Sequence, residues 1–239
     1  MVAPYQIQVR HRPGTQDATI FQEVLGWNEY RFPAQFRSTD FILDIGAHIG
    51  IASLACLLRG AGFVWAVEPD ADNYHLLREN VGGFPGVKTF HGAVWYNNSP
   101  VFFSGYPEGL NACGTVVPGA TVSGVHCRLP VFTLTLDEII GKAVEEGHKK
   151  VRLMKIDCEG AEYPILFGAS LLSYVDEIVG ESHDIPGDWP EKARVNGFDH
   201  YHTTGLIEYL KNQGYDVAWR WACRIGRRAI FHAKRKGIV

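Results

Sequence analysis

The 239-residue sequence has few cysteines and shows no pairing pattern among them. The five cysteines are odd in number and include no C-x-x-C pair, which argues against a disulfide framework and against a zinc knuckle. We expect reduced thiols, as is typical of intracellular proteins. These residues are Cys56, Cys113, Cys127, Cys158 and Cys223.

Long apolar runs are also lacking, since no stretch approaches the about 18 consecutive apolar residues of a membrane span. Residues 1–14 contain no basic region followed by an apolar core, so we expect no secretory leader. A net charge of −3 and an isoelectric point near 6.4 give no global attraction to nucleic acid or to membranes. The sequence therefore predicts a cytoplasmic protein without a membrane partner.

The stretch FILDIGAHIG at residues 41–50 is the one around which the chain is organised. Its apolar run predicts a buried inner strand of a parallel sheet, followed by a turn marked by Gly46 and Gly50 and by a helix over 51–59. Asp44 near the strand end needs a partner, so we expect it to face a ligand or backbone donors. With 46% hydrophobic residues the chain can bury a full core, and we expect one domain over residues 1–239.

A dinucleotide fingerprint is absent from this turn. The G-x-G-x-x-G pattern would need a second glycine where His48 stands, and that bulky side chain disfavours a pyrophosphate. About twenty residues further on, the run FVWAVEP ends in Glu68, the position at which an acid accepts both hydroxyls of a ribose. The two observations together predict a nucleoside without a diphosphate.

Three sequence blocks resemble the FkbM-type S-adenosylmethionine-dependent methyltransferases: DIGAHIG, then VEPD, then KIDCEGAE at residues 155–162. The resemblance covers roughly residues 40–184, and the order of the blocks is more specific than any one of them. It implies a class I, Rossmann-like α/β fold with a mostly parallel seven-stranded sheet, helices on both faces and an antiparallel C-terminal hairpin strand. It also implies methyl transfer from S-adenosylmethionine, usually to a hydroxyl group.

The domain divides into four parts by sequence: residues 1–40 as a cap or lid, 41–96 as the cofactor-binding half, 97–135 as an inserted hairpin and loop, and 136–239 as the catalytic and acceptor-side half. Tyr30 and Phe36 are the lid candidates. The family resemblance places the inserted loop beside the acceptor. The expected cofactor-binding residues are Asp44, Gly46, Ala47, His48, Gly50, Glu68, Pro69, Ala93, Val94 and Asp157, and the expected acceptor-binding residues are Tyr30, Asn111, Asp184 and Trp189.

Acidic residues and a histidine follow two later strands. Asp157 and Glu159 come after the apolar run at 151–156, and Glu181, His183 and Asp184 form the tail of the strand expected in VDEIVGESHD at 175–184. His183, with a usual pKa near about 6.5, is the expected general base, oriented by Glu181 or Asp184. Asp157 or Glu159 is the alternative base.

Several alternatives stay open at this point. A divalent ion on Asp157, Asp184 and His183 is conceivable but not favoured, because mixed acid and histidine ligands suit Mg²⁺ or Mn²⁺ only moderately. The acceptor could be a carboxylate rather than a hydroxyl. An RNA substrate is disfavoured, since only the arginine-rich segment 220–236 offers a basic surface. A non-catalytic S-adenosylmethionine-binding module and a homodimer are the remaining possibilities.

Overall fold

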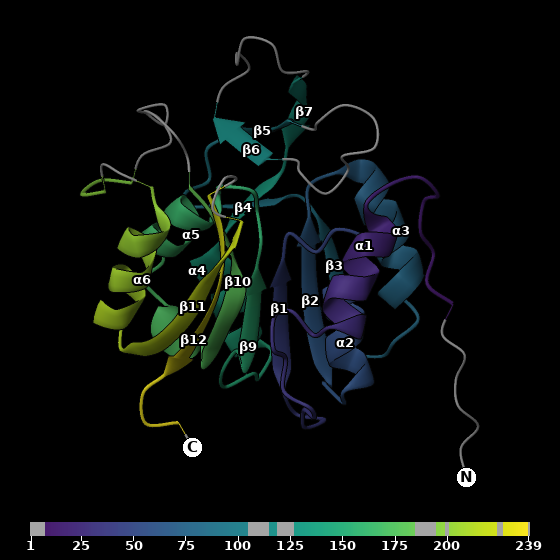
Figure 1. The fold of residues 1–239 in the computed structure, drawn as a ribbon, viewed down its shortest axis with the longest axis horizontal. Helices are drawn as coiled ribbons and strands as arrows, with labels where there is room; N and C mark the ends of the chain where they lie inside the picture. Colours follow the sequence, from purple (N-terminus) through teal and green to yellow (C-terminus); the bar gives the residue numbers. More distant parts are fainter. Residues whose placement is uncertain are drawn as a thin grey trace.

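The computed structural model describes residues 8–104, 115–118, 127–184, 195–198, 201–223 and 227–238. Its centre is a seven-stranded sheet with the order β11-β12-β10-β9-β1-β2-β3, and β12 is antiparallel to both of its neighbours. Figure 1 shows helices on both sides of this sheet. The class I, Rossmann-like fold with an antiparallel C-terminal hairpin strand is therefore confirmed. The strands are β1 (Phe41–Ile45), β2 (Phe63–Glu68), β3 (Val87–His91), β9 (Leu153–Ile156), β10 (Glu177–His183), β11 (Tyr215–Cys223) and β12 (Arg228–Arg235).

The helices follow the apolar and capping signals of the sequence. Asp70 caps the helix after β2 by accepting hydrogen bonds from the N–H groups of Asp72 and Asn73, each at 3.0 Å. Thr135 and Glu138 form a capping box at the start of another helix. The helices are α1 (Asp17–Phe21), the π-helix η1 (Gln22–Gly26), α2 (Ile51–Leu58), α3 (Ala71–Val81), α4 (Leu136–Glu145), α5 (Glu162–Gly168), the 3₁₀-helix η2 (Leu172–Tyr174) and α6 (Thr203–Asn212).

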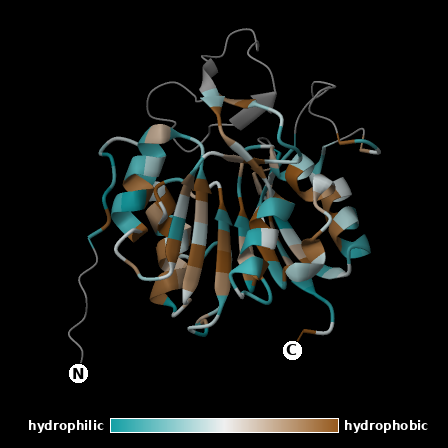
Figure 2. Ribbon diagram, turned by 180° about the vertical axis from the view of Figure 1, so that it is seen from behind, coloured by the Kyte–Doolittle hydropathy of each residue, from teal (hydrophilic) through white to brown (hydrophobic). Residues whose placement is uncertain are grey.

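Two layers of core side chains separate the helices from the sheet. One contains apolar residues of α4, α5 and α6, and the other contains residues of η1 and α2. Seen from the opposite side, the strands carry most of the strongly hydrophobic positions (Figure 2). Strand β1 serves both layers, because Phe41, Leu43 and Ile45 belong to the first and Ile42 to the second.

The parallel register fixes which polar residues meet. Asp44 lies opposite Lys155 in the β1–β9 pair. Because side chains alternate along a strand, Asp44 shares the α2 side of the sheet with Ile42. The two charged residues therefore lie next to each other beneath α2.

The segment between β3 and α4 departs from the expected pattern. The sequence VKTFHGAVWY at 87–96 predicts one continuous third strand, but that strand is interrupted at Gly92, where an added Cβ would lie 2.6 Å from the carbonyl oxygen of Phe132. Two further sheets follow, one pairing β4 (Ala93–Trp95) with β8 (Thr133–Thr135) in parallel. The other joins β5 (Val101–Ser104), β6 (Thr115–Pro118) and β7 (Cys127–Val131) beyond one end of the main sheet (Figure 1).

The N-terminal segment is helical over 17–26, and its second half is wound as a π-helix. The alternating sequence YQIQVR at 5–10 predicts a strand, but residues 8–10, the part of it that the structure describes, form none. Each helix within the described ranges is too short or too polar to traverse a lipid bilayer.

Candidate active site

A pocket lies at the carboxyl edge of the parallel strands. The β1–α2 loop, the end of β2, strand β4 and the segment after β9 contribute to its wall, and α1, η1 and the chain after them cover it. This is the place where open α/β sheets bind their ligands. Among the residues expected to bind the cofactor, the acceptor or the transferred proton, the pocket is lined by Gly46, Ala47, His48, Glu68, Pro69, Ala93, Val94, Tyr30, Asp157, Glu159 and Glu181.

The β1–α2 loop is shaped by two glycines with left-handed backbones. Gly46 has φ of 71°, and a Cβ there would lie 2.0 Å from the carbonyl oxygen of Asp157, so only glycine fits between the two strands' ends. Gly50 has φ of 88° and precedes α2. A Cβ at Gly50 would meet Leu77 at 2.7 Å, and Gly50 does not line the pocket. Its position indicates a packing role between α2 and α3.

His48 has φ of 53°, and its main chain and side chain have separate partners. Its N–H donates to Oε2 of Glu68 at 2.8 Å, while its imidazole Nε2 lies 3.5 Å from the buried carboxylate of Asp17. Burial lowers the pKa of His48 to about 4, so the ring is neutral near pH 7. The side chain thereby connects the loop to the N-terminal segment.

Glu68 is a buried carboxylate at the end of β2. It accepts from the N–H of His48 at 2.8 Å, from the N–H of Asp70 at 3.0 Å and weakly from Nδ2 of Asn73 at 3.4 Å. Burial raises the pKa of Glu68 to about 7 despite these donors. A carboxylate offers about four acceptor positions. About one of them therefore remains for a ligand, and a second becomes available if the weak Asn73 contact is exchanged.

Asp44 has different partners from those expected. Its Oδ2 accepts from the hydroxyl of Ser53 at 2.7 Å, and its Oδ1 lies 3.5 Å from Nζ of Lys155. Its side chain is fully buried and does not line the pocket. The expectation that Asp44 faces a ligand or backbone donors is wrong on this point, because the alternation of β1 turns the side chain toward α2.

Lys155 is a buried cation that the sequence reasoning missed. Its Nζ donates to the carbonyl oxygen of Gly46 at 2.6 Å and lies 4.0 Å from Oδ2 of Asp157 as well as beside Asp44. Burial opposes its charge, but the two carboxylates raise the pKa of Lys155 above its usual value. The two strand-end acids are thus brought together through one ammonium group. The available signal was a lysine inside the apolar run VRLMKI.

Asp157 follows β9 and faces the pocket. The hydroxyl of Tyr30 donates to its Oδ2 at 2.8 Å, so the N-terminal segment contacts the site directly. Burial disfavours the ionised carboxylate, but Lys155, His183 and the Tyr30 hydrogen bond hold the pKa of Asp157 below its usual range. Asp157 is therefore ionised at neutral pH and can accept a proton or a hydrogen bond.

His183 is surrounded by carboxylates. Its Nδ1 lies 2.8 Å from Oε1 of Glu162, and its Nε2 lies 3.3 Å from Glu181 and 3.6 Å from Glu159. Burial opposes protonation, but the Glu162 carboxylate, with Glu181 and Glu159, raises the pKa of His183 well above its usual value. The imidazole is therefore protonated at neutral pH. It does not line the pocket.

Glu162 and Glu159 have contrasting environments in this cluster. Glu162 is fully buried and also accepts from the N–H groups of Cys158 at 3.1 Å and Gly160 at 2.7 Å, which closes the turn before α5. Glu159 has φ of 51° and lines the pocket. Burial, followed by the neighbouring acids, raises the pKa of Glu159 to about 8 even though His183 lies nearby. Glu159 is mostly neutral at pH 7.

A metal site would have to come from the same residues. Asp157, Glu159 and His183 each place one possible ligand atom within 4.8 Å of the others. A cation that bound there would have to displace the proton that the neighbouring acids hold on His183. Asp184, another ligand considered from the sequence, has protein partners at the start of α6. Its Oδ1 accepts from the N–H of Thr203 at 2.6 Å and from the Tyr163 hydroxyl at 3.1 Å.

Two expected acceptor-binding residues, Asn111 and Trp189, lie outside the described residues. The lid candidates differ from each other: Tyr30 lines the pocket, whereas Phe36 is packed in the core beneath α2.

A second residue that the sequence reasoning missed is Arg228 of β12, which lines the pocket and lies 3.3 Å from Glu181. Because Arg228 is one of several basic residues in segment 220–236, nothing in the sequence distinguished it as a pocket residue.

Comparison with known proteins agrees with this architecture. Residues 44–217 match the family model described as the methyltransferase FkbM domain. Over 147 residues the chain is 27% identical to the hexuronic acid methyltransferase AglP of Haloferax volcanii, which covers 60% of this chain. The match spans 56% of the length of AglP, only about half of that relative.

Solved structures give weaker likenesses. One is TrmK of M. capricolum with S-adenosylhomocysteine, with a TM-score of 0.47 and 9% identity over 88% of this chain and 68% of that one. Another is a precorrin-6y C5,15-methyltransferase of Geobacter metallireducens, with a TM-score of 0.43 and 13% identity over 89% and 87%. Likenesses of this strength support no argument about this chain.

Proposed function

The chain belongs to the methyltransferase FkbM family, and from this premise we propose that it is an S-adenosylmethionine-dependent O-methyltransferase acting on a small hydroxylated molecule such as a sugar. One observation carries the proposal. Glu68 and Asp157 stand at the ends of strands on either side of β1 and line one pocket around the Gly46 turn. Glu68 has the position and chemistry of a group that accepts hydrogen bonds from ribose hydroxyls. Asp157 has those of a group that accepts a proton.

The residues of the β2 side fit the cofactor. Glu68 has acceptor capacity left after its protein donors are counted, and Ala93 and Val94 are small apolar residues that suit one face of an adenine. The Gly46 turn packs closely against the segment after β9, and this contact sets the shape of that wall of the pocket. When bound, S-adenosylmethionine would supply a methyl group on a positively charged sulfur. The acceptor oxygen would attack the methyl carbon in line with the carbon–sulfur bond, and the sulfur would leave as the neutral thioether.

The protein's part in such a transfer is alignment and the handling of one proton. Alignment of two reactants can supply about 7–11 kcal/mol of the barrier. A hydroxyl acceptor also loses a proton, and a positioned base contributes roughly 10²–10⁴-fold. We assign this base to Asp157, because it is ionised and faces the pocket. His183 was favoured by the sequence, but its protonation and its position outside the pocket lining speak for a charge-balancing role among the acids.

A sugar-like acceptor is supported by two further observations. The relative AglP is named as acting on a hexuronic acid, and a hydroxylated ring is the feature that we carry over from it. The pocket also holds groups that suit hydroxyls, since Glu159 is mostly neutral and can donate while Asp157 accepts.

RNA is a weaker candidate, because the basic C-terminal segment is largely neutralised within the described residues. Five of its described cations have carboxylate or backbone partners, which leaves little of an open basic groove. These partners are Glu29 for Arg220 at 3.0 Å, Glu181 for Arg228 at 3.3 Å, Glu177 for Lys234 at 4.0 Å, Asp216 for Lys236 at 3.9 Å and the carbonyl oxygen of Val175 for Arg235 at 3.1 Å.

The proposal is tested by incubating the protein with S-adenosylmethionine carrying an isotopically labelled methyl group and a panel of sugars, uronic acids and RNA. We expect label in a sugar-type product. The Asp157→Asn variant should lower the chemical step by about 10²-fold or more while S-adenosylhomocysteine still binds in calorimetry. Label in RNA alone would refute the acceptor class. If His183→Asn were inactive and Asp157→Asn active, the assignment of the general base would change from Asp157 to His183.

A further inference from the structure

The loop between η1 and β1 is built to hold one side chain over the pocket. Asn28 and Arg31 have φ of 50° and 56°, conformations that are costly for residues other than glycine. The side chain of Asn28 clamps the loop by accepting from the N–H of Phe32 at 2.9 Å and donating to its carbonyl oxygen at 3.0 Å. Tyr30 lies inside this clamp.

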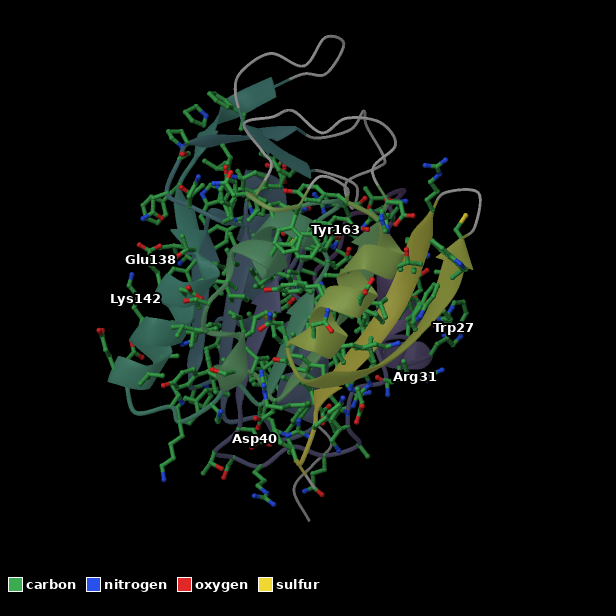
Figure 3. The ribbon with its side chains drawn as sticks, turned by 90° about the vertical axis from the view of Figure 1, so that its left-hand side faces the viewer. Trp27, Arg31, Asp40, Glu138, Lys142 and Tyr163 are labelled. Atoms are coloured by element: carbon green, nitrogen blue, oxygen red, sulfur yellow. The ribbon has the colours of Figure 1, made fainter. Side chains whose placement is uncertain are left out.

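The loop is also tied to the far edge of the sheet. Glu29 lies 3.0 Å from the guanidinium of Arg220 on β11, and its N–H donates to the carbonyl oxygen of Glu23 at 3.0 Å. Figure 3 shows Trp27 and Arg31 beside the hairpin of β11 and β12. The loop therefore has fixed contacts on both sides of Tyr30.

Tyr30 itself is buried, with 7% of its surface exposed, and its ring lies 5.7 Å from that of Phe32. Its hydroxyl donates to Oδ2 of Asp157, 127 positions away in the sequence. Two other buried or half-buried tyrosines show the ordinary solution for such a hydroxyl, since Tyr209 and Tyr215 donate to backbone carbonyl oxygens. Tyr30 instead engages a carboxylate that lines the pocket.

We propose that Tyr30 is a positioning residue for Asp157: its hydroxyl occupies Oδ2 and fixes the carboxylate rotamer, so that Oδ1 is the oxygen left for the acceptor hydroxyl. The inference rests on the proposed function, in which Asp157 receives the proton. The clamped loop thereby makes the N-terminal segment part of the catalytic apparatus, although no atom of Tyr30 takes part in the transfer.

The hydrogen bond also affects ionisation. Donation by Tyr30 favours the charged form of Asp157 alongside Lys155 and His183, so removal of the hydroxyl raises the pKa of the carboxyl group. Because the reaction needs the ionised carboxylate, activity is lost as the pH falls through this pKa. The other charged or titratable groups around Asp157 come from η1, the β1–α2 loop, the end of β9, β10 and β12, and they are Glu23, His48, Cys158, Glu159, Glu181 and Arg228.

The test compares Tyr30→Phe with a matched control, Tyr163→Phe. Tyr163 is also a buried tyrosine that donates to an aspartate, Asp184 at 3.1 Å, but neither of the pair lines the pocket. For Tyr30→Phe we expect kcat to fall roughly 10- to 100-fold, as for a slightly misplaced catalytic group. The affinity for S-adenosylhomocysteine should stay within about twofold, and the acidic limb of the kcat profile should move to higher pH.

Tyr163→Phe should lose stability in denaturant melts and keep the wild-type kcat and pH profile. A full kcat in Tyr30→Phe, or equal losses in the two variants, would overturn the inference. If Tyr30→Phe does not fold, Asn28→Ala, which removes the clamp and keeps Tyr30, must reduce kcat in the same direction for the inference to stand.

A double-variant measurement separates this inference from the proposed function. In an Asp157→Asn background, Tyr30→Phe should have no further effect on the residual rate, because the carboxylate that it positions is gone. If Asp157→Asn is fully active, the base assignment fails. If Asp157→Asn is inactive while Tyr30→Phe alone is fully active, only the role of Tyr30 fails.

Discussion

The ionisation of Glu68 makes cofactor binding depend on pH in a predictable direction. Burial raises the pKa of Glu68 to about 7 in the free protein, so the carboxyl group is largely protonated below that value. A ribose hydroxyl donates more strongly to the charged carboxylate than to the neutral acid. The affinity for S-adenosylhomocysteine should therefore rise with pH by up to about tenfold per unit below pH 7 and level off above it.

The Glu68→Gln variant gives the magnitude. A hydrogen bond to a charged group contributes about 1.5–3 kcal/mol, and about 1.4 kcal/mol is tenfold in affinity. Loss of the charge should thus weaken binding by roughly ten- to a hundredfold at alkaline pH and abolish the pH dependence. Isothermal titration calorimetry with S-adenosylhomocysteine on both sides of pH 7 measures both effects.

A suitable control is Glu177→Gln. Glu177 is equally buried and pairs with Arg152 at 2.9 Å and His232 at 3.1 Å, but it does not line the pocket. This variant should lose stability and keep the wild-type affinity. An affinity that is independent of pH in the wild type and unchanged in Glu68→Gln would refute the assignment of Glu68 to the ribose.

The same raised pKa affects folding stability with the opposite sign to a salt-bridged acid. The folded state holds the Glu68 proton up to about pH 7, whereas a glutamate in an unfolded chain loses its proton at about pH 4.3. Between these values the folded protein binds more protons than the unfolded chain, so its stability decreases as the pH rises through this window. Part of that decrease should be absent from Glu68→Gln in denaturant melts.

Two further predictions concern the β1–α2 turn. Gly46→Ala should abolish cofactor binding and lower stability, because the new Cβ would lie 2.0 Å from the Asp157 carbonyl oxygen and the residue would keep a φ of 71°. If calorimetry gave this variant the wild-type affinity for S-adenosylhomocysteine, the close approach would be contradicted. NAD and NADP should not bind detectably, since His48 stands where dinucleotide sites have glycine, and micromolar affinity for either would count against the nucleoside assignment.

The central fold could be predicted from local signals. The runs ending at Ile45 and Glu68 are apolar and are followed by turn and cap residues, so strand and helix positions follow from periodicity and capping. The break at Gly92 could not be predicted in this way. It exists because β4 leaves the main sheet to pair with β8, and the close contact of Gly92 with Phe132 is a long-range one.

Many of the residues that line the pocket could also be predicted, because the carboxyl ends of parallel strands meet at one edge of a sheet. The side on which each acid lies was harder to assign. Asp44 precedes the last residue of β1 and turns toward Ser53, whereas Asp157 follows the end of β9 and faces the pocket. A shift of one or two positions relative to the strand end thus separates an acid that is buried beneath α2 from one that lines the pocket.

The charge state of the acid–histidine cluster shows why residue types alone could not rank the two candidate bases. A histidine near acids looks like a base, but three acidic side chains from two segments surround His183, and Glu162 contributes most to holding its proton. A group that is already protonated cannot accept another proton at that nitrogen. Asp157 has the opposite situation, since Lys155, His183 and Tyr30 stabilise its charged form. The same electrostatic coupling therefore disfavours His183 as the proposed base and favours Asp157.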